Sequence, residues 1–103
     1  NDLITMKMAG ADDVWMHARG IPGAHVIIKT GSVKGEVPEG ALMAAAGIAA
    51  YFSKGRASSK VAVDYTLRRN VKKPKGARPG MVTYDHHRTI MAIPALPAPD
   101  VMR

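Results

Sequence analysis

Hydrophobic and polar residues alternate along several segments of this chain with the period of a half-buried β-strand. The clearest case is Lys60 to Leu67, where Val61, Val63 and Tyr65 occupy every second position. Val14 to Arg19 alternates in the same way, so this strand would have two usable faces. Alternation or β-branched runs predict further strands over Leu3 to Ala9, His25 to Thr30, Met81 to Tyr84 and Thr89 to Ile93.

One segment has the pattern of an α-helix instead, and we place this helix over Pro38 to Ser53. Pro38 and Glu39 suit the first turn of a helix, and Lys54 suits its end. Residues 41–50 are apolar on all sides, which is typical of a buried helix rather than a surface helix.

Together these elements predict an α+β fold, with a largely antiparallel sheet of about six strands packed on one main buried helix. Residues 70–79 form a basic connector whose prolines limit strand pairing. The length of 103 residues fits one domain. We place this domain over residues 1–94 and expect a flexible, Pro- and Ala-rich tail over residues 95–103.

The positive charge of the chain is concentrated in one segment. The formal net charge is +7, and residues 54–78 hold nine basic residues and a single acid, Asp64. The remainder holds six basic and seven acidic residues, so the whole excess lies in that segment. A basic surface of this kind attracts a polyanion by long-range potential and counterion release. The alternative is a solvated face that only maintains solubility, but the mixture of arginine and lysine favours phosphate binding.

The pattern Asp13-x-Trp15-x-His17 is the most distinctive short motif. Alternation would place its three side chains on one face of a strand, roughly 6 to 7 Å apart. The structural interpretation is a turn-capping aspartate, a core tryptophan and a histidine bonded to the backbone. The functional interpretation is a recognition patch in which Trp15 stacks on a base. The residues alone leave both interpretations open.

Other functional classes have little support in the sequence. The chain has no cysteine, which excludes disulfides and thiolate zinc sites. No run approaches the roughly 18 apolar residues of a membrane span. Adjacent histidines such as His86 and His87 point to opposite faces of a strand, and no ligand set has a recognisable spacing. We therefore expect no metal site, no cofactor, no catalytic residues and no membrane contact.

Several motifs occur together in a collinear order. Asp13-x-Trp15-x-His17 is followed by Gly20-Ile21-Pro22-Gly23-Ala24-His25-Val26 and by an alanine-rich helix that ends Tyr51-Phe52-Ser53-Lys54. Later motifs are Ser59-Lys60-Val61-x-Val63-Asp64-Tyr65-Thr66, Val71-Lys72-Lys73-Pro74-Lys75-Gly76-Ala77 and Pro79-Gly80-Met81-Val82-x-Tyr84. In this order the chain resembles the NFACT-R domain, part of the RqcH and fibronectin-binding protein A group, over residues 1–94.

The resemblance implies an RNA-binding module of a ribosome-associated quality-control factor. Members of the family bind large ribosomal subunits that carry stalled nascent chains, and they recruit aminoacyl-tRNA. The expected partners are therefore tRNA or ribosomal RNA, the large subunit and other domains of the parent protein, in the cytoplasm. A protein-docking module on the ribosome, or a surface adhesin of the fibronectin-binding kind, is the alternative.

Motif, charge and resemblance together give one set of candidate nucleic-acid-binding residues. The motif and the turn after it contribute one part of this set, and the basic segment contributes the other. The candidates are Asp13, Trp15, His17, His25, Lys54, Arg56, Arg68, Arg69, Lys72, Lys73, Lys75 and Arg78.

Overall fold

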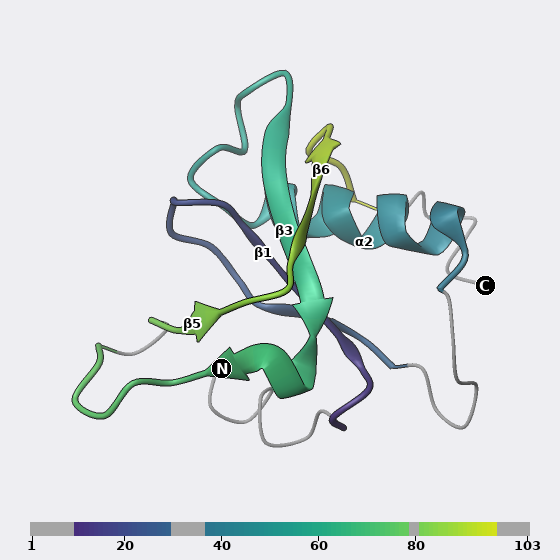
Figure 1. The fold of residues 1–103 in the computed structure, drawn as a ribbon. Helices are drawn as coiled ribbons and strands as arrows, with labels where there is room; N and C mark the ends of the chain where they lie inside the picture. The colour runs from purple at the N-terminus through teal and green to yellow at the C-terminus, as the bar shows by residue number, and fades with distance from the viewer. Residues whose placement is uncertain (1–9, 30–36, 79–80, 97–103) are drawn as a thin grey trace.

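A four-stranded antiparallel sheet forms the centre of the molecule (Figure 1). The computed structural model describes residues 10–29, 37–78 and 81–96. The sheet has the order β2-β1-β3-β6, made of Val26–Ile28, Val14–Ala18, Val61–Leu67 and Arg88–Ala92. Its register places His17 opposite Asp64, and Asp64 opposite Thr89. Residues distant in sequence therefore meet on the central strand β3.

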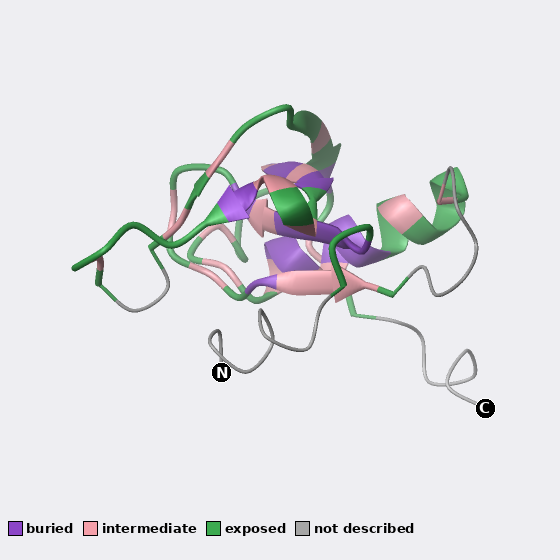
Figure 2. Cartoon of the chain, turned by 60° about the horizontal axis from the view of Figure 1, so that its bottom comes forward, coloured by how far each residue is buried: buried purple, intermediate pink, exposed green. Residues whose placement is uncertain are grey.

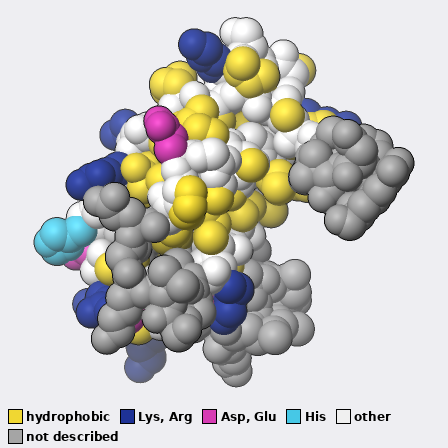
Figure 3. Space-filling model, turned by 90° about the vertical axis from the view of Figure 1, so that its right-hand side faces the viewer, with side chains coloured by type: hydrophobic (Ala, Val, Ile, Leu, Met, Phe, Trp, Pro, Cys, Tyr) yellow, Lys and Arg dark blue, Asp and Glu magenta, His cyan; other side chains and the backbone are white. Residues whose placement is uncertain are grey.

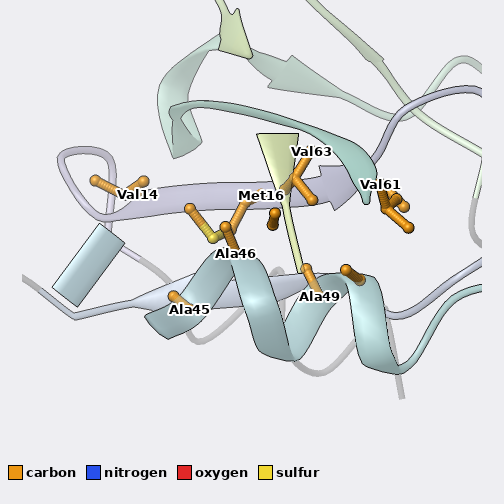
Figure 4. Packing of buried hydrophobic residues seen from close by; sticks show 10 residues of the cluster. Val14, Met16, Ala45, Ala46, Ala49, Val61 and Val63 are labelled. Atoms are coloured by element: carbon orange, nitrogen blue, oxygen red, sulfur yellow. The ribbon is translucent and has the colours of Figure 1, made fainter. Parts of the chain in front are cut away.

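The helix α2 (Glu39–Tyr51) packs on one face of this sheet and contacts all four strands. Alternate residues of β1 and β3 form the core with alanines of the helix (Figure 4); the labelled members are Val14, Met16, Val61 and Val63 with Ala45, Ala46 and Ala49. Small helical side chains let backbone approach closely. The amide of Ala95 donates to the carbonyl oxygen of Gly47 at 3.1 Å, where a side chain on Gly47 would lie 3.2 Å from the carbonyl oxygen of Ile93.

A second, two-stranded sheet follows the central strand. The short 3₁₀ helix η1 (Arg68–Asn70) leads into β4 (Val71–Lys72), which pairs with β5 (Thr83–Tyr84). The Thr66 hydroxyl donates to the carbonyl oxygen of Asp85 at 3.0 Å and so ties the segment after β5 to the central sheet. This arrangement brings Tyr84 to the face of the sheet that α2 does not cover, because its contacts are to residues that alternate with the helix-facing ones.

The predicted α+β class and the antiparallel pairing are confirmed, but the described strands are not all in one sheet as expected. The described residues form separate sheets of four and two strands. Residues 70–79 were expected only to connect, yet Val71 and Lys72 pair as a strand because they precede the first proline, Pro74. The predicted strand Leu3 to Ala9 lies outside the described residues.

The expectation that the helix is buried on all sides is also wrong for its first half. Residues Ala41, Met43 and Ala44 are exposed, and burial begins at Ala45, where the helix reaches the sheet (Figure 2). Of the expected tail at 95–103, only residues 95 and 96 are described, and Ala95 is bonded to α2. Within the described ranges, no helix has the length and apolar character needed to cross a membrane.

Candidate nucleic-acid interface

Trp15 and His17 lie on the face of β1 that points away from the helix. Their rings stack with centroids 6.0 Å apart and planes inclined by 7°. Tyr84 of β5 covers the indole, with ring centroids 4.7 Å apart, and His25 packs beside both rings. The side chains of Trp15, His17, His25 and Tyr84 are called the aromatic cluster below.

Within the aromatic cluster, Trp15 is fully enclosed. Its relative exposure is 0%, and its indole N–H donates to Nδ1 of His25 at 2.7 Å. Because this nitrogen accepts, the proton of a neutral His25 ring is on Nε2. Stacking of Trp15 on a nucleobase does not fit this burial, because Tyr84 and His17 already cover the indole. The structural interpretation of Trp15 is therefore the one that the geometry favours.

His17 holds the turn at residues 20–23 against the strand. Its Nε2 lies 3.1 Å from the carbonyl oxygen of Gly23, and its Nδ1 lies 2.6 Å from that of Ala18. A neutral imidazole carries one N–H and can donate to only one of these oxygens at a time. Gly23 also approaches the end of α2 closely, since a side chain there would lie 3.0 Å from Cβ of Ser53. The turn is thus fixed between β1 and the helix.

Asp13 is placed by its local backbone rather than by the aromatic cluster. It is 5% exposed, accepts the amide N–H of Gly10 at 2.8 Å and forms an ion pair with Lys29 at 2.9 Å. The turn-capping interpretation of Asp13 fits these contacts. A carboxylate held in this way is a poor candidate for contact with an RNA phosphate, because both charges are negative.

Asp64 is a buried acid that the sequence alone identifies only as a charge. Its carboxylate is on the same face as the aromatic cluster and accepts hydroxyl hydrogen bonds from Tyr84 at 2.6 Å and Thr89 at 2.7 Å. Arg19 and His87 lie 3.9 Å from it. Burial, followed by the hydrogen bond and the charge of Asp64, raises the pKa of Tyr84 to about 12. Asp64 therefore fixes β5 to the central sheet.

An open groove runs above the aromatic cluster, with a volume of about 570 Å³. The turn at residues 20–23 forms one wall, and Met81, Val82 and Tyr84 form the other. Among the described residues of its lining, Arg78 is the one Lys or Arg residue. The groove is thus mostly apolar, with one guanidinium placed where it could meet an anion.

The basic candidates fall into two groups along the chain, one before β3 and one after it. Lys54 and Arg56 lie in the loop before this strand, and six others follow it: Arg68, Arg69, Lys72, Lys73, Lys75 and Arg78. The groups are not fully separate in space, because Arg78 lines the groove beside the turn at residues 20–23, and the amide of Lys54 donates to the carbonyl oxygen of Pro22 in that turn at 2.9 Å.

The arginines of η1 are engaged within the protein. Arg69 pairs with Asp12, and Arg68 donates to the carbonyl oxygen of Val71 at 3.0 Å. By contrast, the described residues include no ion-pair partner for four exposed cations, which are Lys72, Lys73, Lys75 and Arg78. These four are called the hairpin cations below. A phosphate contact would break no ion pair of these four cations, although the charge of Lys72 already acts on Asp85.

The right-hand side of the molecule as seen in Figure 1 has a different character. Hydrophobic side chains gather across its middle, and lysine and arginine side chains lie toward its edges (Figure 3).

Among the described residues, no group of three or more His, Asp or Glu side chains is arranged to hold a metal ion.

Comparisons with known proteins agree over nearly the whole chain. The family described as "NFACT protein RNA binding domain" matches residues 1–85. The chain is 50% identical over 94 residues to the protein named Rqc2 homolog RqcH of Bacillus subtilis, and 42% identical over 95 residues to that of Streptococcus pneumoniae strain D39. Each match covers 91% of this chain, which spans only 16% of the length of these relatives.

A solved structure supports the same assignment. The C-terminal part of the fibronectin/fibrinogen-binding protein from Streptococcus suis superposes with a TM-score of 0.81 at 40% sequence identity. The superposition covers 92% of this chain and 37% of that one. The chain therefore belongs to the NFACT protein RNA-binding domain family.

Proposed function

We propose that this domain binds tRNA or ribosomal RNA as part of a ribosome-associated quality-control factor that acts on stalled large subunits. The hairpin cations carry this proposal, because they are exposed and have no ion-pair partner among the described residues. The family description and the names of the curated relatives support it. A cytoplasmic location belongs to the same proposal.

The hairpin cations would contact phosphates, which position an RNA without reading its sequence. Three of them are lysines, which act as point charges, and Arg78 offers a planar fork in the lining of the groove. The aromatic cluster contributes indirectly, because His17 fixes the turn that forms the opposite wall. In this proposal Trp15 and His25 shape the interface, and neither they nor Asp13 touch RNA.

A fluorescence-anisotropy titration tests the proposal. The chain is titrated against a labelled tRNA and a DNA duplex of similar length at several salt concentrations. Preference for tRNA with steep salt dependence is the expected result, because RNA shape and 2′-hydroxyls would add to charge. Equal affinity for both nucleic acids would reduce the site to a general basic surface.

Protein docking is a second candidate function, and the apolar surface favours it. Met91, Ile93 and Leu96 are 55%, 65% and 50% exposed, and such exposure is a common feature of interaction surfaces. The partner would be a ribosomal protein or another part of the parent protein. This candidate predicts no measurable binding to either nucleic acid near physiological salt. The adhesin alternative has support only from the name of the streptococcal relative.

A further inference from the structure

Phe52, and not Trp15, is the exposed aromatic residue of this domain. All five aromatic residues of the chain are described, and Phe52 is the exposed one among them, at 52%. It directly follows α2 and precedes the basic loop at residues 54–60. A large apolar ring at half exposure has a hydration cost that a stacked partner would remove.

The surroundings of Phe52 hold it in a defined place. The amide of Phe52 donates to the carbonyl oxygen of Ile48 at 3.0 Å, and its own carbonyl accepts from Ala24 at 3.1 Å. The hydroxyl of Ser53 donates to the carbonyl oxygen of Ala50 at 2.7 Å and accepts from the amide of Gly55 at 3.1 Å. The helix end and the turn after it are therefore ordered before any ligand binds, which lowers the entropy cost of binding.

Tyr51 and Arg56 support the ring from the side. Tyr51 packs edge to face on Phe52, with ring centroids 5.1 Å apart and planes at 81°. The guanidinium of Arg56 lies 4.1 Å from the centroid of the Tyr51 ring and donates to the Tyr51 hydroxyl at 2.6 Å. Arg56 thus brings a positive charge beside the aromatic pair while its side chain is restrained.

The charge around Phe52 is of one sign. Residues 54–60 contain Lys54, Arg56 and Lys60 and no acid, and all three cations are exposed. An exposed aromatic ring next to unopposed cations matches the chemistry of an unpaired nucleotide, whose base stacks on an aromatic ring and whose phosphate meets a cation. A protein partner would need acidic and apolar groups in one surface, whereas a single strand of RNA supplies both features in every nucleotide.

We propose that Phe52, with Tyr51 and Arg56, forms a stacking platform for one unpaired base of a single-stranded RNA segment. Lys54 and Lys60 contact the adjoining phosphates. This proposal rests on the proposed RNA-binding function and adds a second site, at the end of α2 and the loop before β3, to that of the hairpin cations. The two sites would hold different parts of one RNA.

The test uses a short single-stranded RNA with one 2-aminopurine, whose fluorescence falls when it stacks. Wild-type protein should bind the oligomer and quench this fluorescence. Phe52→Leu keeps an apolar side chain but removes the ring, so we expect affinity about ten-fold weaker and no quenching. Phe52→Trp should retain the wild-type affinity and the quenching. Ile93→Ala, which changes another exposed apolar residue, is the matched control and should behave as wild type.

The outcomes separate this proposal from the function on which it rests. Unchanged affinity and quenching in Phe52→Leu, with tRNA binding intact, would overturn the platform alone. Binding of tRNA without binding of the oligomer would also overturn it. If wild-type protein binds neither RNA, the RNA-binding function fails and the platform fails with it. Thermal unfolding of each variant confirms that weaker binding does not reflect an unfolded protein.

Discussion

The indole N–H of Trp15 donates to Nδ1 of His25 across 2.7 Å, and both side chains are buried. This bond links strand β1 to the residue that precedes β2. It also satisfies the one polar atom of the only tryptophan in the chain. Because buried donors without an acceptor are costly, the pair is a determinant of stability rather than a ligand contact.

Removal of the acceptor should destabilise the fold. His25→Ala leaves the indole N–H unpaired, and we expect a decrease of about 1–3 kcal/mol in the free energy of unfolding. His25→Asn places an amide oxygen near the position of Nδ1 and should recover part of the lost free energy of unfolding. Urea unfolding, monitored by the fluorescence of Trp15, measures the stability of both variants. The fluorescence changes because the indole passes from a buried to a solvated environment. Equal stability of all three proteins would contradict the structural role.

The buried carboxylate of Asp64 gives a second stability prediction. Asp64→Ala removes the acceptor of the Tyr84 and Thr89 hydroxyls, and we expect the free energy of unfolding to fall by about 2–3 kcal/mol. Asp12→Ala is the matched control, because it removes an acid whose ion pair with Arg69 is half exposed, and it should cost less than about 1 kcal/mol. Similar destabilisation in the two variants would show that Asp64 does not fix β5 to the sheet.

The pH dependence of stability follows from Tyr84. Its pKa is raised from 10.0 to about 12 in the folded protein, so the neutral phenol is the form that folding favours. The resulting stabilisation is fully present below pH 10 and is lost as the pH rises toward 12. Tyrosinate absorbance should show a step near pH 12 that is missing in Tyr84→Phe. Stability of that variant should also fall less steeply between pH 10 and 12. A step near pH 12 that persists in Tyr84→Phe would assign the raised pKa elsewhere.

The sequence predicted the regular part of the fold well. Strands were expected over Val14 to Arg19 and Lys60 to Leu67, and the structure has them at Val14–Ala18 and Val61–Leu67. Their alternation reflects one face that packs on α2. The helix was expected because its ends and its alanine run are both local signals. Its exposed first half could not be predicted, because composition does not say how far a helix extends past its sheet.

The site was harder to predict because its contacts are long-range. Alternation placed Trp15 and His17 on one face, but nothing local indicated that Tyr84 covers them. In the sequence Asp64 is only the single acid of a basic segment. Its role was not visible because its partners Tyr84 and Thr89 lie 20 and 25 residues later. The strands β4 and β5 have two residues each, which is too short for a periodic pattern. Nothing in the sequence indicated that Phe52 is exposed, because this residue directly follows an apolar helix.

The salt dependence of tRNA binding tests the central claim most directly. For every phosphate that the protein no longer neutralises, the slope of log affinity against log salt should become shallower by about 0.7 to 0.9. The triple variant Lys72→Ala, Lys73→Ala, Lys75→Ala should therefore bind tRNA more weakly, with a slope shallower by roughly 2 to 3. Arg88 is an exposed cation of β6 and is not one of the hairpin cations. Arg88→Ala is therefore compared with Arg78→Ala, as the control for the loss of one positive charge anywhere on the surface. A triple variant with the affinity and slope of the wild-type protein would contradict the proposed interface.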